Sequence, residues 1–407
     1  MNQSIKDGNL NLSSSELKAT IPPLKPRILL LSAYDAGSHK RWREQLVFSQ
    51  PEFEWHVLAL SPRFFRWRIR GNALTWLSEP LLKESWDLLL VTSMVDLASI
   101  RGFHPNLAHT PALLYMHENQ FAYPASDAQH SSVDPQMVNL YSAIAAEAVL
   151  FNSDWNRRSF LEGVEKLFRR LPDGIPEGTL ERLAAKSRVL PVPIDDHVFR
   201  NEGARQNPED GERLWGSSLE SRPCSSPLRI VWAARWEYDK GPDRLLAILQ
   251  ELDRRAVSYQ VCVLGESFRK VPEAMTTIQQ QFAHRLVQFG YASSRTEYYQ
   301  WLGSADVILS TALHEFQGLA VLEAVAAGCV PIVPEREVYP ELFAPEYLYP
   351  DCGDDIPAEA AHAAALIETQ AVNGHGERLT VPDVQRFSRG SLTPIYKALL
   401  SEAITEL

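Results

Sequence analysis

Short apolar runs alternate with longer segments of helical periodicity along both halves of the chain. Runs of five to eight β-branched and aliphatic residues that are separated by helical segments predict buried parallel strands in βαβ units. We therefore expect an α/β protein with a parallel sheet in each half. The expected strands lie at 27–34, 86–92, 111–116 and 189–193 in the first half, and at 228–233, 259–266, 287–291, 305–311 and 330–334 in the second.

Length and local composition predict two domains. A chain of 407 residues with 45% hydrophobic residues can bury two cores. The first residues are polar, and the stretch from Asn201 to Pro227 is rich in Gly, Ser, Pro and charge. The predicted division is a disordered lead at 1–25, a first domain at 26–200, a linker at 201–227 and a second domain at 228–385, followed by a final segment at 386–407.

Two glutamates stand eight positions apart around a glycine in the second half. Glu315 and Glu323 bracket Gly318, which opens an apolar helical run directly after the expected strand at 305–311. Free N–H groups at such a helix start favour an anion, and Glu323 can accept hydrogen bonds from a ribose diol. The pattern predicts a nucleotide site at the carboxyl end of a strand. The alternative is a solvated helix face with a capping carboxylate.

A second cluster of charges follows the expected strand at 228–233. Arg235 and Lys240 lie in the next loop, just before Pro242 at the first turn of a helix. Two cations at a strand's carboxyl end can neutralise a diphosphate, Arg by a bidentate fork and Lys as a point charge. The alternative is an exposed network in which both pair with Glu237 and Asp239.

Polar loops also follow the expected strands of the first half. Small residues let a ligand approach the backbone closely, and His and Lys add donors. Polar side chains at a strand end are costly unless they are hydrated or bound to a ligand. The first loop contains Gly37, Ser38, His39 and Lys40, and a later one contains His117, Glu118, Asn119 and Gln120.

These motifs resemble a known family. The Glu-x7-Glu spacing with the following Ala-x-Ala-x-Gly-x-x-Pro is similar to the donor signature of retaining glycosyltransferases of family 4, which have the GT-B fold. The similarity to the tRNA-queuosine mannosyltransferase family covers about 26–349. It rests on Ala-Gly-Ser-His-Lys40, His117-Glu-Asn-Gln-x-x-Tyr-Pro124, Phe151-Asn-Ser-x-x-Asn156, Arg235-Trp-Glu-x-Asp-Lys240, His314-Glu-Phe-x-Gly318 and Val338-Tyr-Pro-Glu341.

The resemblance implies two Rossmann-like domains that face each other across a central cleft, with the helix at 386–407 crossing back onto the first domain. It also implies transfer of mannose from GDP-mannose, without a cofactor, to the cyclopentenediol of queuosine in an aspartate tRNA. The chain departs from the family pattern at Gln317, where an aromatic is usual, and at Ala234, where a His is usual.

Residue roles carry over with the resemblance. Glu315 is expected beside the transferred sugar, Glu323 at the ribose, and Arg235 and Lys240 at the leaving pyrophosphate; His117 joins them as a catalytic candidate. The other expected donor-site residues are Gly37, Ser38, Gly265, Glu266, Tyr291, His314, Phe316, Gln317, Gly318 and Leu319. The expected acceptor-side residues are His39, Lys40, Glu118, Asn119 and Gln120.

Charge is distributed unevenly between the halves. The net charge is −11, from 40 Lys+Arg against 51 Asp+Glu. Residues 1–190 contain 21 basic and 20 acidic residues, so the remainder has 40−21=19 against 51−20=31. The first half also contains an arginine cluster that is interleaved with aromatics, which suits tRNA phosphates and bases. A solvated helix face or a membrane-surface patch are the alternatives. The cluster consists of Arg63, Arg66, Arg68 and Arg70.

Other features limit the class of protein. No run approaches the roughly 18 apolar residues of a membrane helix, and the four cysteines lack a Cys-x-x-Cys pair. We expect a cytoplasmic, metal-independent enzyme without stable membrane insertion.

Because no carboxylate in the first half stands out as a nucleophile, we expect front-face displacement, in which the leaving phosphate takes the proton of the acceptor hydroxyl. Two other hypotheses are a family 4 enzyme with a lipid or glycan acceptor, and a non-catalytic protein that binds nucleotide sugars.

Overall fold

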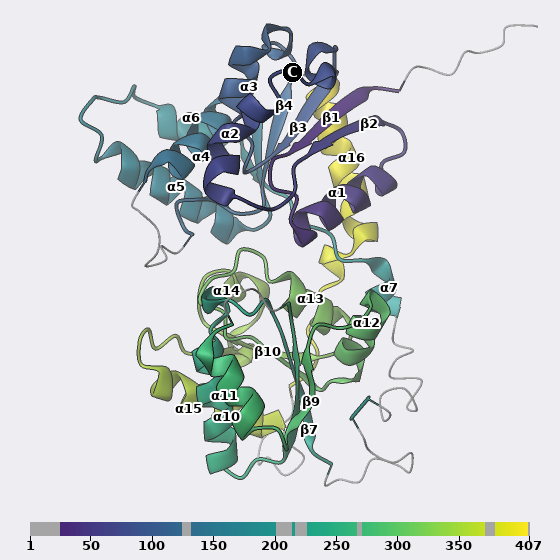
Figure 1. Ribbon diagram of the computed structural model, residues 1–407, viewed down its shortest axis with the longest axis vertical. Helices are drawn as coiled ribbons and strands as arrows, with labels where there is room; N and C mark the ends of the chain where they lie inside the picture. The colour runs from purple at the N-terminus through teal and green to yellow at the C-terminus, as the bar shows by residue number, and fades with distance from the viewer. Residues whose placement is uncertain are drawn as a thin grey trace, which may run out of the picture.

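The computed structural model describes residues 25–123, 132–200, 214–215, 226–266, 271–370 and 379–405. The expected lead at 1–25 and linker at 201–227 lie almost entirely outside these residues. The described chain forms two α/β domains, which Figure 1 shows one above the other. The predicted α/β class is confirmed.

The first domain is built on a six-stranded parallel sheet in the order β2-β1-β3-β4-β5-β6. Its central strands are buried on both faces, which explains their continuous apolar sequences. The strands are β1 (Arg27–Ser32), β2 (Glu54–Ala59), β3 (Leu88–Thr92), β4 (Ala112–Met116), β5 (Ala148–Phe151) and β6 (Ser187–Val189). The helices are α1 (Gly37–Ser49), α2 (Phe65–Thr75), α3 (Leu97–Phe103), α4 (Asp134–Ala145), α5 (Asp154–Phe168) and α6 (Thr179–Ala185). The short helix α7 (Asp196–Arg200) follows them in the chain but packs against the second domain.

The second domain has a parallel sheet in the order β12-β11-β10-β7-β8-β9. Its strands are β7 (Leu228–Ala233), β8 (Tyr259–Leu264), β9 (Leu286–Gly290), β10 (Val307–Leu309), β11 (Val330–Pro334) and β12 (Leu348–Tyr349). The helices are α10 (Pro242–Arg254), α11 (Glu273–Gln281), α12 (Arg295–Ser304), α13 (Leu319–Ala326), α14 (Tyr339–Leu342) and α15 (Ile356–Gln370). Because β7 and β10 are adjacent and parallel, the loops that follow them emerge side by side.

The last helix, α16 (Arg389–Thr405), packs on the first domain beside α1. Leu392 and Leu400 are buried in the same core as the first-domain strands. Trp42 Nε1 donates to the Tyr396 hydroxyl at 3.0 Å, so a polar contact also fixes the helix there. Figure 1 shows this helix lying against the first domain.

The chain crosses between the domains twice, and the two crossings pair with each other. Ile194 N–H donates to the Phe387 carbonyl at 2.8 Å, and Arg389 N–H donates to the Ile194 carbonyl at 2.8 Å. The strand expected at 189–193 instead lies at Ser187–Val189. Leu190 N–H still bonds to Phe151, but Pro191 and Pro193 have no N–H with which to extend the ladder.

Candidate active site

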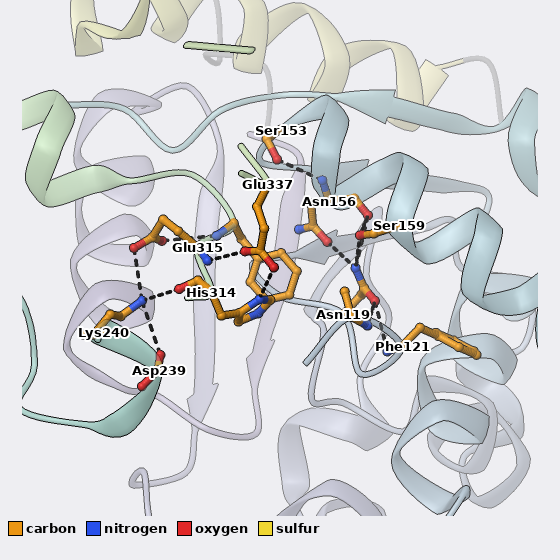
Figure 2. Close-up of polar contacts among 12 residues, drawn as sticks. Asn119, Phe121, Ser153, Asn156, Ser159, Asp239, Lys240, His314, Glu315 and Glu337 are labelled. Carbon is orange, nitrogen blue, oxygen red and sulfur yellow. Dashed lines mark hydrogen bonds and ion pairs between the residues drawn. The ribbon is translucent and has the colours of Figure 1, made fainter. Parts of the chain in front are cut away.

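The loops after β7 and β10 bring the two charged motifs of the second domain together. Lys240 Nζ donates to a Glu315 carboxylate oxygen at 3.1 Å and to the His314 carbonyl at 2.8 Å, and it lies 3.4 Å from Asp239 (Figure 2). Lys240 and Glu315 both line a pocket at the ends of these strands, together with Thr311. Sequence segments 75 residues apart therefore form one site.

Opposite charges stabilise the ionised forms of this pair. Burial lowers the pKa of Lys240, but the Glu315 and Asp239 carboxylates outweigh burial and the pKa lies above its usual value. Burial raises the pKa of Glu315, but the Lys240 ammonium outweighs it and the pKa lies below its usual value. Both groups are charged at neutral pH.

Arg235 lies beside Lys240 and is more exposed. Its guanidinium is 2.6 Å from Glu237 and 3.7 Å from Asp239, so the ion pairs considered from the sequence do form. The guanidinium also donates a hydrogen bond to the Tyr123 hydroxyl of the first domain. Half of the Arg235 side chain remains exposed (48%), which leaves it accessible to an anionic ligand.

The loop before α13 is held by a residue that the sequence interpretation missed. Glu337 follows β11, accepts from Glu315 N–H at 2.5 Å and lies 2.9 Å from His314 Nδ1 (Figure 2). Its backbone has a φ of 52°, a left-handed conformation that is costly for a side chain other than Gly. Only the motif at 338–341 directly after it hinted at a role for this loop.

Glu337 leaves one His314 nitrogen free for other contacts. With Nδ1 at the carboxylate, Nε2 is buried and has no hydrogen-bond partner in the described residues. The ring also meets Tyr123 of the first domain edge-on at 5.3 Å. Because buried polar atoms usually have a hydrogen-bond partner, a water or a substrate hydroxyl is a candidate partner for this nitrogen.

Glu323 on α13 is buried (3% exposed) and already has four donors. Arg41 from α1 lies 2.8 Å away, Arg295 donates at 3.1 Å, and the hydroxyls of Tyr298 and Tyr299 donate at 3.1 and 3.3 Å. It is therefore neither a solvated nor a capping carboxylate. A ribose diol at Glu323 would have to displace at least one of these donors.

The other residues of the loop between β10 and α13 each contact a different part of the protein. Gln317 exchanges hydrogen bonds with the backbone of Val192 at 3.0 and 2.9 Å, so its side chain joins the domains rather than facing a sugar. Phe316 packs edge-on against His314 at 4.4 Å. Gly318 has a φ of 72° and caps the start of α13, where Leu319 is its first residue.

The expected base-pocket residues follow β8 and β9. A Cβ at Gly265 would fall 1.9 Å from the Ala234 carbonyl, so only glycine fits there. Glu266 accepts from Trp236 N–H through its backbone at 3.1 Å. Tyr291 is largely exposed (76%).

In the first domain, two histidines and a glutamate form a buried cluster. His39 Nε2 lies 3.0 Å from Glu118, whose other oxygen accepts from Ser93 at 2.8 Å. The rings of His39 and His117 stack with centroids 4.1 Å apart. His117 Nε2 is buried without a partner in the described residues.

The two histidines differ in protonation. Burial lowers the pKa of His39, but Glu118 outweighs burial and the pKa lies above its usual value. Burial, helped by the positive charge on His39, holds the pKa of His117 well below its usual value. His117 is therefore neutral at neutral pH and can exchange hydrogen bonds with a hydroxyl.

The rest of the first-domain candidates divide into exposed and structural residues. Gly37, Ser38 and Lys40 are exposed at the start of α1. Asn119 is fully buried and satisfied: its side chain donates to Asn156 and Ser159 and accepts from two backbone N–H groups (Figure 2). Asn119 therefore has no exposed surface with which to contact a substrate directly, and its acceptor-side role stays a prediction. Gln120 donates through its backbone to Asn139 at 2.8 Å.

The arginine cluster lies at the start of α2. Arg63, Arg66 and Arg70 are exposed, whereas Arg68 is partly buried. Arg70 is 3.0 Å from Asp96, so part of its charge is neutralised.

The described residues contain no group of three or more His, Cys, Asp or Glu side chains placed to hold a metal ion. None of the described helices is both long and apolar enough to cross a bilayer.

The two α/β domains with parallel sheets have the GT-B fold. The structure resembles Anabaena HepE in complex with UDP (TM-score 0.62, 13% identity, covering 93% of this chain and 100% of that one). It also resembles sucrose-phosphate synthase from Thermosynechococcus elongatus (TM-score 0.62, 14% identity, 94% and 100%). These likenesses confirm the predicted GT-B fold.

The sequence narrows the class to one family. Residues 27–194 match the model of the tRNA-queuosine alpha-mannosyltransferase N-terminal domain, and residues 223–369 match glycosyl transferases group 1. The chain is 33% identical over 327 residues to the Drosophila melanogaster tRNA-queuosine alpha-mannosyltransferase, covering 80% of this chain and 84% of that protein. It belongs to the tRNA-queuosine alpha-mannosyltransferase family.

A more distant relative shares half of the chain. The Mycobacterium tuberculosis GDP-mannose-dependent alpha-(1-6)-phosphatidylinositol dimannoside mannosyltransferase is 24% identical over 196 residues, which is 48% of this chain and 47% of that protein.

Proposed function

We propose that this protein transfers mannose from GDP-mannose to the cyclopentenediol of queuosine in aspartate tRNA, with retention of anomeric configuration. Family membership supports the acceptor, and two relatives whose names specify mannosyl transfer support the sugar. The structural observation that carries the proposal is the contact between Lys240 and Glu315, which joins a diphosphate-binding loop to a sugar-binding loop.

The donor is proposed to lie along the carboxyl edge of the second sheet. Arg235 and Lys240 take the diphosphate, and the N-terminus of α13 adds N–H groups and the positive end of its dipole. Glu323 takes the ribose after one of its donors moves aside. Glu315 and His314 then face the mannose, held in position by Glu337.

The reaction is proposed to occur on one face of the sugar. The bond from the anomeric carbon to the diphosphate breaks while a bond to the acceptor hydroxyl forms on the same face, and the hydroxyl proton passes to the leaving phosphate oxygen. Catalysis is then mainly charge stabilisation by Arg235 and Lys240. Neutral His117 in the facing domain can orient a hydroxyl through its free Nε2.

The proposal is tested by incubating the protein with queuosine-containing tRNA and a panel of nucleotide sugars, followed by nucleoside mass analysis. Queuosine should gain one hexose with GDP-mannose, and tRNA that lacks queuosine should gain none. Transfer from another nucleotide sugar alone would contradict the donor assignment. No modified nucleoside with any donor would contradict the acceptor assignment.

A lipid acceptor is the second candidate, because the Mycobacterium relative is named for a phosphatidylinositol substrate. The exposed arginines and aromatics around α2 could also contact an anionic membrane surface. Mannosylation of lipid extracts with no transfer to tRNA would favour this candidate.

A further inference from the structure

The start of α2 presents two aromatic side chains to solvent. Phe64 is 70% exposed and Trp67 is 53% exposed, although aromatics of this size are usually buried. Phe65 between them turns inward and meets Tyr34 edge-on at 6.1 Å. Most residues from 61 to 67 are exposed, and Phe65 is the exception.

Phe64 is held in an unfavourable backbone conformation. Its φ of 56° and ψ of 51° place it in the left-handed region, which bulky residues avoid. It stands at the N-cap of α2, yet no side chain caps the helix there. Strained backbone conformations persist only where the surrounding structure enforces them, and they are found most often at functional sites.

Trp67 lies against a glycine one turn along the helix. A Cβ at Gly71 would fall 2.4 to 2.7 Å from three atoms of the indole ring, so the ring lies directly against the Gly71 backbone. Glycine inside a helix is unfavourable, but here it makes room for the indole. The indole therefore packs on the helix backbone while about half of the side chain (53%) stays exposed.

The charge around these rings is positive. The Arg63 guanidinium lies 5.9 Å from the Phe64 ring centroid, and the segment 60–78 contains four arginines and no acidic residue. Protein surfaces that combine aromatic faces with arginines match nucleic acids, whose phosphates need cations and whose bases stack on rings. A neutral protein partner would not explain the charge.

This surface borders the proposed active site. Phe65 packs against Tyr34, which follows β1 at the carboxyl edge of the first sheet. Tyr34 is close enough to the Arg235 guanidinium and the Glu118 carboxylate to be affected by both charges. A nucleotide on the exposed rings would therefore be a neighbour of a nucleotide in the cleft.

We propose that Phe64 and Trp67 form a stacking surface for nucleobases that flank the nucleotide receiving the sugar. This inference rests on the proposed tRNA acceptor. Stacking would hold the anticodon loop open, because a base stacked on protein is unstacked from its RNA neighbours.

The test compares Trp67→Ser, Trp67→Phe and Gly71→Ala with the wild-type protein. Phe48→Ser is the matched control, since Phe48 is also exposed (75%) but lies at the far end of α1. The measurement is the dissociation constant for queuosine-containing tRNA over a range of salt concentrations. Thermal melting checks that each variant is folded, and binding of GDP reports on the donor site.

Trp67→Ser should weaken tRNA binding by about 5- to 150-fold, the range for loss of one stacked base. Trp67→Phe should stay within about twofold because a phenyl ring still stacks, and Gly71→Ala should resemble Trp67→Ser because it displaces the indole. GDP affinity and the salt slope should not change, since stacking involves no counterion release.

Unchanged tRNA affinity in folded Trp67→Ser would overturn the stacking surface, even if the wild-type protein mannosylates tRNA. Loss of binding to anionic vesicles with tRNA affinity intact would overturn it in favour of a membrane face. A wild-type protein that binds tRNA but does not modify it would refute the proposed function, and the Trp67 comparison would still decide the stacking surface.

Discussion

Replacing Lys240 by Met removes the central cation of the site while nearly preserving its volume. Lys240 is mostly buried (12% exposed), and its ammonium lies 3.1 Å from Glu315 and 3.4 Å from Asp239. Removing one partner of a buried ion pair typically costs about 3–5 kcal/mol of stability, because the other charge is left unpaired. For a domain of this size that corresponds to a fall in melting temperature of roughly 6–20 °C.

Activity should fall independently of stability. If Lys240 neutralises the leaving diphosphate, Lys240→Met should reduce mannosyl transfer on the order of 100-fold or more, measured below the melting temperature of the variant. Arg235→Ala should cause a similar loss of activity. Its effect on stability should be small because the side chain is half exposed.

A double variant separates the two effects. Lys240→Met combined with Glu315→Gln removes both charges of this pair but leaves Asp239 with Arg235 alone, so part of the lost stability should return while activity remains lost. Scanning calorimetry and initial-rate measurements on the same samples provide both quantities. Wild-type activity in Lys240→Met, or recovery of activity in the double variant, would refute the assignment of Lys240 to the diphosphate.

Three further predictions concern the surrounding groups. Glu337→Gln has only one acceptor oxygen, so it can no longer accept from both Glu315 N–H and His314 Nδ1. The kcat/KM of this variant should drop roughly tenfold or more, and an unchanged value would exclude a positioning role for Glu337. Histidine NMR should show that His39 is still protonated above pH 6.5 and that His117 is still neutral below pH 6.5. The contribution of His39 to the free energy of unfolding is therefore lost as the pH rises through its raised pKa. The contribution of His117 is lost as the pH falls through its lowered pKa. His39→Asn should raise the pKa of His117, and no change would contradict the coupling. Arg41→Met should tighten GDP binding roughly tenfold by calorimetry, because Arg41 occupies the Glu323 oxygen that a ribose needs; weaker binding would mean that Arg41 contacts the nucleotide instead.

Apolar runs located most strands of both sheets, although β2, β5 and β12 were not predicted, and the strand-end loops indicated where the candidate site lies. In a parallel sheet the carboxyl ends of neighbouring strands meet at one edge, so Lys240 and Glu315 could be placed near each other before any contact was known. The expected strand at 189–193 was misplaced because apolar character was given more weight than the missing N–H groups of its two prolines.

Side-chain directions and contacts between domains could not be predicted in this way. Asn119 and Gln317 were assigned to substrates, yet Asn119 turns into the first domain and Gln317 bonds to Val192 across the interface. The pairing of Arg41 with Glu323 depends on how the domains meet, which no local pattern encodes. Glu337 was missed because its role depends on a left-handed backbone that only the folded loop reveals.

The most direct test of the proposed function is a reaction with GDP-mannose labelled with carbon-13 in the sugar and purified queuosine-containing aspartate tRNA. The nucleosides are then isolated and the anomeric carbon is examined by NMR. The proposed mechanism predicts labelled mannose on the cyclopentenediol of queuosine in the same α configuration as the donor. A β linkage would contradict front-face displacement, and label that is absent from queuosine would contradict the proposed function itself.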